Sequence, residues 1–149
     1  MQETFNILCV DDEQIVLDSI QKHLRRIDAV NVLTALSVNS ALKVMEDNNI
    51  HIILTDLMMP DIDGLEFLKI IQSKNSDIIA VMITGYATIN SALQAMQLGA
   101  FDYLAKPFTK EELVKIIHRA LDMAKAGSQN AKEFHASKPG KDSVGSVKG

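Results

Sequence analysis

Short apolar runs alternate with longer stretches of helical periodicity along most of this chain, and this alternation restricts its fold more than any other feature. The first, third and fourth runs are continuously apolar, which is typical of parallel strands covered on both faces. The runs lie at Ile7 to Val10, Val30 to Leu33, Ile50 to Leu54, Ile78 to Ile83 and Tyr103 to Ala105. Five β/α units in succession predict an α/β fold with a doubly wound parallel sheet and right-handed crossovers.

The segments between the runs show apolar residues at the spacing of helices that turn one face to a core. Thr109 and Glu112 form a capping-box pattern at the start of the last helix, and Gly99 marks the end of the fourth. Cys9 is the single cysteine and is expected in the core. The inward stripes are predicted at Val16, Ile20, Leu24 and Ile27; Leu42 and Met45; Leu65, Leu68 and Ile71; Ile89, Leu93 and Met96; and Leu113, Ile116, Ile117, Ala120, Leu121 and Ala124.

The composition divides the chain after residue 126. A chain of 149 residues with 47% hydrophobic content suits one domain with a proper core. Residues 127 to 149 hold four of the seven glycines and almost no large apolar residues. Such a segment cannot bury enough surface to offset its ordering entropy, so it is predicted to be a flexible tail or linker remnant.

The charge and the hydropathy of the chain restrict which partners and which cellular compartment are expected for it. Residues 1 to 126 contain 11 Lys and Arg against 17 Asp and Glu, a net charge of −6, which argues against direct nucleic acid binding by this domain. No apolar stretch reaches the roughly 18 residues that span a bilayer, and the start MQETFN has no signal-peptide pattern. The sequence therefore predicts a cytoplasmic protein that does not contact membranes.

Carboxylates follow the first and third predicted strands directly, at Asp11, Asp12, Glu13 and Asp56. Functional sites in open α/β sheets lie beyond the carboxyl ends of the strands, so these groups are expected on one rim. Two unit charges about 4 Å apart repel by about 4 kcal/mol at an effective dielectric near 20. Converging carboxylates must therefore protonate or recruit a hard cation such as Mg²⁺. For the acidic triplet alone, a solvated loop end is an equally good interpretation.

Asp56 shifts the interpretation toward phosphoryl transfer. Thr84 and Lys106 follow the fourth and fifth strands, so a hydroxyl and a cation are expected on the same rim as Asp56. A carboxylate nucleophile, a charge-neutralising metal and donors for the phosphoryl oxygens are the parts that this reaction needs. Taken singly, a threonine at a strand end is more often a β-branched edge residue, and a lysine before proline is more often solvated.

These residues lie in ordered motifs, VDDE, TDLMMPDIDGLE, ITGYA and GAFDYLAKPF, which closely resemble those of response regulator receiver domains in two-component signalling. The resemblance covers about residues 4 to 126, and residues 1 to 126 are expected to form the receiver domain. The segment TGYATINSALQAMQLGAFDYLAKPF is most similar to receivers of the sigma-54 activator, or NtrC-like, class. The resemblance implies a flavodoxin-like (βα)5 sheet in the strand order 2-1-3-4-5.

The resemblance also implies the chemistry of the site. Asp56 is expected to be the phosphoacceptor, which takes a phosphoryl group from a sensor histidine kinase. Asp12 and Asp56 are expected to bind Mg²⁺ with the main-chain carbonyl of Met58, and Asp11 is expected to act mainly through water. Glu13 has the weakest claim to a direct role. The protein is then a signalling switch rather than a classical enzyme.

Two residues are implied to form the switch, namely Thr84, which moves toward the phosphoryl group, and Tyr103, which moves into the space that is released. The affected surface is formed by the fourth helix, the fifth strand and the fifth helix. Read without the resemblance, Tyr103 is more simply a core aromatic residue. The resemblance further implies a cis Lys106-Pro107 bond, which is found in only about 5 to 6% of X-Pro bonds.

The same surface is a plausible homodimer interface, in which Asp102 and Arg119 are candidates for intersubunit ion pairs, although exposed pairs of this kind usually contribute little. Met58 and Tyr86 stand two residues beyond Asp56 and Thr84. Both are bulky, and neither side chain is a general base for an attacking water. The sequence therefore predicts slow self-dephosphorylation.

Other classes of protein fit this sequence less well. A flavin-binding flavodoxin shares the fold, but the carboxylates after the first strand would repel the FMN phosphate. A phosphatase or mutase needs a second acid or base just after Asp56, where Leu57 and Met58 stand. The sequence contains no P-loop motif. The four histidines lack zinc-ligand spacing: His23, His51, His118 and His135. A binding module that keeps the fold without the chemistry is the remaining alternative.

Overall fold

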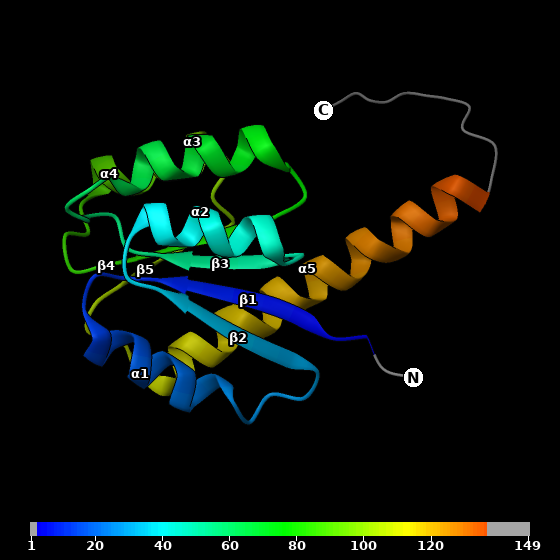
Figure 1. Cartoon of the computed structure of the whole chain (residues 1–149), viewed down its shortest axis with the longest axis horizontal. Helices are drawn as coiled ribbons and strands as arrows, with labels where there is room; N and C mark the ends of the chain where they lie inside the picture. Colours follow the sequence, from blue (N-terminus) through cyan, green and yellow to red (C-terminus); the bar gives the residue numbers. More distant parts are fainter. Residues whose placement is uncertain (1–2, 137–149) are drawn as a thin grey trace.

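A computed structural model describes residues 3 to 136 and contains five strands that alternate with five helices (Figure 1). The strands are β1 (Phe5–Val10), β2 (Val30–Ala35), β3 (Ile52–Thr55), β4 (Ile79–Thr84) and β5 (Asp102–Ala105). The helices are α1 (Gln14–Leu24), α2 (Val38–Asp47), α3 (Gly64–Lys74), α4 (Ile89–Gln97) and α5 (Lys110–Ala136). The βα alternation expected from the apolar runs is confirmed.

The strands form one sheet in the order β2-β1-β3-β4-β5, and all four neighbouring pairs are parallel. This is the predicted flavodoxin-like order. Val10, the last residue of β1, is opposite Ala35 of β2 and Thr55 of β3. Because these strands end in register, the residues that follow β1 and β3 emerge side by side at one rim of the sheet.

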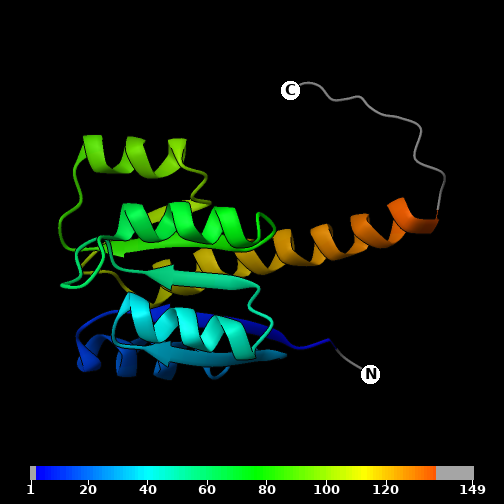
Figure 2. The same ribbon diagram turned by 45° about the horizontal axis from the view of Figure 1, so that its top comes forward.

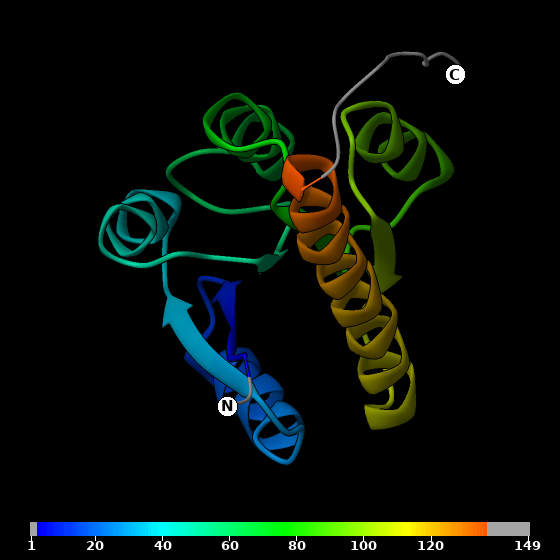
Figure 3. The ribbon, with the colours of Figure 1, turned by 90° about the vertical axis from the view of Figure 1, so that its right-hand side faces the viewer.

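The helices cover both faces of the sheet, with α1 and α5 on one face and α2, α3 and α4 on the other (Figure 3). Ile7 and Cys9 of β1 pack with α1 and α5, whereas Leu8 and Val10 pack with α2 and α3. This division follows from the two-residue period of a strand. Cys9 is fully buried, as predicted, and burial raises the pKa of its thiol to about 12, so the thiol stays protonated in the core.

The prediction that Ile89, Leu93 and Met96 of α4 face the core is wrong. Their exposed fractions are 80%, 56% and 47%, and Ala95 is the buried residue of this helix. The small alanine lets α4 lie close to its neighbours, so the larger residues are left on the outer side. Helical spacing identifies an apolar stripe but does not say which way a helix with two apolar sides turns.

The last helix is longer than the composition predicted. The flexible tail was expected to start at residue 127, but α5 continues to Ala136 and extends beyond the sheet (Figures 1 and 2). Ala131, Lys132 and Glu133 are good helix formers, which favours this continuation. The rest of the predicted tail, residues 137 to 149, lies outside the described residues. Within residues 3 to 136, no helix has the length and apolar character needed to cross a membrane.

Three local features fix the loops that join helices and strands. Thr109 and Glu112 bond reciprocally at the start of α5, as the capping-box pattern predicted. Gly99 ends α4 with a φ of +98°, a backbone region that favours glycine. The Asp63 carboxylate accepts hydrogen bonds from the N–H groups of Leu65 and Glu66 and so caps α3.

Candidate functional site

A hollow of about 460 Å³ lies at the carboxyl ends of the strands and brings together most of the predicted site residues. The Asp56 side chain is buried. Asp56 directly follows β3, and its N–H donates to the carbonyl of Val10, which holds it beside the end of β1. Among the described residues that line this hollow, Thr84 is absent. The hollow is lined by Asp12, Glu13, Asp56, Met58, Met59, Pro60, Gly85, Tyr86 and Lys106.

The amino group of Lys106 joins the two buried carboxylates of the site. Its Nζ lies 2.7 Å from Asp11 Oδ2 and 3.1 Å from Asp56 Oδ2. Glu13 Oε1 lies 4.0 Å away on an exposed side chain, so Glu13 contributes little to this contact. The Lys106-Pro107 bond is cis, as the resemblance implied. The lysine that follows β5 therefore does reach the carboxylates that follow β1 and β3.

Burial and charge shift the proton affinities of the two best-placed groups. Burial raises the pKa of Asp11 above its ordinary range, although the hydrogen bond from Lys106 acts in the opposite direction. Burial alone would lower the pKa of Lys106, but its hydrogen bonds to Asp11 and Asp56 outweigh that effect and raise the pKa. Lys106 is therefore a firmly held cation beside a carboxyl that burial disfavours as an anion.

Three carboxylates of the site form a set that could hold a cation. Oxygen atoms of Asp11, Asp12 and Asp56 all lie within 4.8 Å of one another. An all-oxygen set of carboxylates is the donor chemistry that Mg²⁺ prefers. Asp12 is exposed, so it is open to an incoming ion. Asp11 is already engaged, because Oδ1 accepts the Glu13 N–H at 2.9 Å and Oδ2 accepts from Lys106.

The loop after Asp56 is held close to that residue by its backbone. The Met58 N–H donates to Asp56 Oδ1 over 3.2 Å, and the Gly64 N–H donates to the Leu57 carbonyl over 2.7 Å. A Cβ at position 64 would lie 2.5 Å from the carbonyl oxygen of Asp56, which is too close for any side chain. Gly64 is therefore required for the loop to fold back against the predicted phosphoacceptor.

The two predicted switch residues form separate hydrogen bonds. Thr84 is fully buried at the end of β4, and its Oγ1 accepts the Tyr86 N–H over 3.1 Å. Tyr103 is partly buried on β5, and its hydroxyl lies 2.6 Å from Ser91 Oγ on α4. The partly buried ring agrees with the simpler core interpretation, and the hydroxyl contact ties β5 to α4.

Two residues of this region were missed by the sequence analysis. Ser91 bonds Tyr103 and also completes the cap of α4 with Thr88. Asp61 reaches across to α2, where its carboxylate accepts the N–H groups of Val38 and Asn39. Burial opposes the effect, but these backbone donors lower the pKa of Asp61 overall. Both contacts join different elements, so no local spacing reveals them.

Asp102 and Arg119, the predicted candidates for intersubunit pairs, bond each other within one chain. Arg119 Nη1 lies 2.7 Å from Asp102 Oδ2, and its guanidinium lies 5.5 Å from the centre of the Phe101 ring. The pairing arises because β5 and α5 are consecutive elements that lie against each other. The charges expected to bridge two subunits are thus already paired within the monomer.

Comparison with protein families matches residues 7 to 118 to the response regulator receiver domain. Among curated relatives, the regulatory protein AtoC of Escherichia coli is 34% identical over 120 residues, which cover 78% of this chain and 25% of AtoC. The transcriptional regulator NtrC of Proteus hauseri is 32% identical over 116 residues, which cover 78% of this chain and 24% of NtrC. The chain thus spans about a quarter of the length of these relatives.

The fold is also similar to solved structures. A receiver domain protein from Clostridium thermocellum superposes with a TM-score of 0.75 at 34% identity, covering 82% of this chain and 98% of that chain. AtoC and NtrC agree with the resemblance to the sigma-54 activator class. The family match ends at residue 118, so it describes the β/α body.

Proposed function

Because the chain belongs to the response regulator receiver domain family of two-component signalling, we propose that it is a phosphorylation-dependent switch. Asp56 accepts a phosphoryl group from a sensor histidine kinase in a Mg²⁺-dependent reaction. The observation that carries this proposal is the position of Lys106 Nζ, 2.7 Å from Asp11 and 3.1 Å from Asp56. Asp11, Asp56 and Lys106 follow β1, β3 and β5, so this contact brings the ends of three strands together at Asp56, the proposed nucleophile.

The reaction is an in-line displacement at phosphorus. A carboxylate oxygen of Asp56 forms the new P–O bond as the P–N bond of the phosphohistidine breaks, and the imidazole leaves with the electron pair. Asp12, Asp56 and the Met58 carbonyl would hold Mg²⁺, with Asp11 acting through water. The ion supplies positive charge for the phosphoryl oxygens. Lys106 neutralises Asp56 beforehand and pairs with the phosphoryl group afterwards.

Phosphorylation adds about −1.5 to −2 charge and three acceptor oxygens, and Thr84 is proposed to sense them. Among the described residues, its hydroxyl accepts the Tyr86 N–H and donates no hydrogen bond, so its proton is available to a phosphoryl oxygen. Movement of Thr84 toward the site opens space for Tyr103, which then leaves Ser91. Loss of the Tyr103–Ser91 bond frees α4 and changes the surface formed by α4, β5 and α5.

That surface is the proposed site of homodimer formation. Ile89, Leu93 and Met96 expose apolar side chains on α4, and exposed apolar residues that lie together mark interaction sites. Asp102 and Arg119 lie on β5 and α5 and are already paired within the monomer. The apolar face of α4 is therefore a better source of dimer affinity than these charges.

The phosphoryl group is proposed to be long-lived. Met58 and Tyr86 line the hollow and are 51% and 65% exposed, so both lie where an attacking water would approach. Neither side chain activates water at neutral pH. Self-dephosphorylation of Asp56 should therefore be slow.

The direct test is intact mass after incubation with Mg²⁺ and acetyl phosphate. The wild-type chain should gain about 80 Da, the mass of one phosphoryl group, and keep it after the donor is removed. Asp56→Asn or EDTA should abolish the gain, and Asp122→Asn, an exposed carboxylate on α5, should not. A gain that persists in Asp56→Asn would place the phosphoryl group elsewhere, and no gain at all would indicate a binding module without phosphoryl chemistry.

A further inference from the structure

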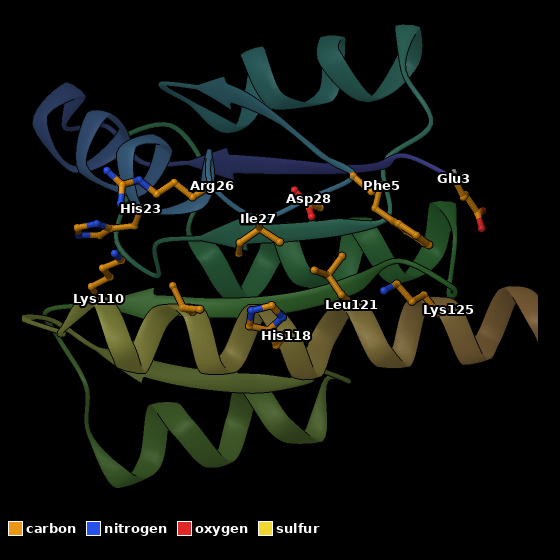
Figure 4. Close-up of a pocket in the computed structure, with 12 residues that line it drawn as sticks. Glu3, Phe5, His23, Arg26, Ile27, Asp28, Lys110, His118, Leu121 and Lys125 are labelled. Atoms are coloured by element: carbon orange, nitrogen blue, oxygen red, sulfur yellow. The ribbon is translucent and has the colours of Figure 1, made fainter. Parts of the chain in front are cut away.

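A second concave region lies between α1 and α5, on the opposite face of the sheet from α4. Its volume is about 640 Å³, within the range of small-molecule sites. Basic side chains line it from three segments: His23 of α1, Arg26 of the α1–β2 connection, and Lys110, His118 and Lys125 of α5 (Figure 4). We call this region the α1–α5 groove.

The basic character of the groove is unusual for this chain. With histidine counted as neutral, residues 1 to 126 carry a net charge of −6, yet the groove has three cations, Arg26, Lys110 and Lys125, against two carboxylates, Glu3 and Asp28. Among the described residues, Arg26, Lys110 and Lys125 take part in none of the ion pairs. The folded chain therefore gathers cations here without pairing them.

Helix stabilisation does not account for Lys110. The positive end of a helix dipole lies at its N-terminus, where a cation is unfavourable. Lys110 is the first residue of α5. Basic residues at the end of α1 complement that helix, but Lys110 carries an electrostatic cost in its own helix. A bound anion in the groove would offset that cost.

The floor of the groove is apolar. Phe5, Ile27, Val114 and Leu121 are the large apolar residues among those that line it. In Figure 4, His23, Arg26 and Lys110 lie toward one end, Glu3 and Lys125 lie toward the other, and Ile27 and Leu121 lie between them. An anion can thus lie against the cationic end while an apolar group covers the floor.

We propose that the α1–α5 groove binds a small phosphorylated ligand, with its phosphates against Arg26 and Lys110 and a planar apolar group on Ile27 and Leu121. Nucleotides have this combination of groups. The acidic body around the groove disfavours a long nucleic acid chain, which would meet repulsion beyond the groove. This proposal does not depend on the phosphorylation of Asp56, because the groove contains none of the residues of that site.

The test uses ATP as a probe, in EDTA, with ¹⁵N-labelled Asp56→Asn protein so that the phosphorylation site is inactive. Backbone amide shifts should saturate with ATP and should concentrate around residues 23 to 29 and 110 to 125. Inorganic tripolyphosphate should bind about 10-fold more weakly, because it lacks the group that covers the apolar floor. Equal affinity for the two probes would overturn the proposal.

A pair of charge-matched variants separates the groove from general electrostatics. Arg26→Gln with Lys110→Gln should weaken ATP binding by at least about 10-fold, the effect of removing charged hydrogen-bond donors. Arg25→Gln with Lys115→Gln removes the same charge from exposed positions of the same segments that do not line the groove, and should change binding by less than about 2-fold. Equal losses in the two pairs, or shifts that never saturate, would refute a specific site.

Discussion

Lys106 links the strand ends at the proposed phosphorylation site, and its charge contributes to the stability of that contact. Its Nζ bonds Asp11 and Asp56, and the lysine side chain is only 17% exposed. Those two bonds outweigh burial and raise its pKa above the ordinary 10.5. Burial raises the pKa of Asp11 above its ordinary value of 3.8. Above pH 3.8 the ionised Asp11 carboxylate therefore lowers the free energy of unfolding, and the hydrogen bond from Lys106 limits that loss.

The first prediction concerns alkaline stability. A lysine with a raised folded pKa contributes stability that is fully present below its unfolded pKa and is lost as pH rises through the folded pKa. Lys106→Met should lower the free energy of unfolding at pH 7 by about 1 to 3 kcal/mol, below the value for a fully buried pair because solvent reaches the site. The difference from wild type should stay constant to about pH 10 and shrink above it.

Urea unfolding of both proteins between pH 7 and pH 11.5 measures that difference. Lys115→Met removes an exposed lysine of α5 and should change stability by less than about 0.5 kcal/mol at every pH. A Lys106→Met difference that persists unchanged at pH 11.5 would show that packing, and not charge, explains the loss.

The sequence was informative about site residues that directly follow strands. Asp11, Asp56 and Lys106 leave the sheet at one rim, so the parallel order alone predicts that they meet. Ser91 and Asp61 were not predictable in this way. Each bonds a partner on another element, Tyr103 and the start of α2, and such contacts depend on how the helices lie on the sheet.

The β3–α3 loop is the element whose geometry most constrains the site. Gly64 places its backbone where a Cβ would lie 2.5 Å from Asp56 O and 2.6 Å from Leu57 Cα. Both contacts are with backbone, so a larger residue cannot be accommodated by a side-chain rotation. The loop must therefore move away from the strand end if position 64 gains a side chain.

Gly64→Ala should lower the free energy of unfolding by about 1 to 3 kcal/mol, the usual cost of overpacking. It should also slow phosphoryl uptake from acetyl phosphate, because the displaced loop carries Met58 and moves Asp56 Oδ1. Urea midpoints and intact-mass time courses measure the two effects.

Gly127 provides the matched control, because it lies in α5 and an added Cβ there meets nothing within 4 Å. Gly127→Ala should raise stability by about 0.5 to 1 kcal/mol through helix propensity and leave phosphorylation unchanged. If Gly64→Ala matched wild type in both measurements, the close approach of this loop to Asp56 would not constrain the site.

Helix α4 shows that sequence periodicity alone does not predict which side of a helix is buried. Its apolar residues have helical spacing, yet Ile89, Leu93 and Met96 are exposed and Ala95 is buried. A helix on the outer part of a sheet is positioned by small residues and by loop contacts, and spacing does not record these. The length of α5 was missed for a related reason: composition at residues 127 to 136 suggested a linker, whereas helical continuation from Lys110 extends through it.

At the scale of the whole molecule, the sheet separates two sites of opposite charge. The carboxylates of Asp11, Asp12 and Asp56 gather at one rim, whereas the α1–α5 groove is lined by Arg26 of the α1–β2 connection and by Lys110 and Lys125 of α5. The strands that carry the carboxylates are buried on both faces, so the acidic rim is held rigidly against its own repulsion. A cation at that rim should therefore stabilise the entire fold rather than a local loop.

The last prediction is that Mg²⁺ raises the melting temperature of the unphosphorylated protein. Binding to the folded state alone at ten times Kd contributes about 1.4 kcal/mol, which corresponds to about 3 to 6 °C for a domain of this size. Asp12→Asn should abolish the shift, because it removes the exposed member of the carboxylate set. It should not destabilise the metal-free protein, since it also removes like-charge repulsion. Asp122→Asn should keep the full shift; an equal shift in Asp12→Asn would place the ion elsewhere.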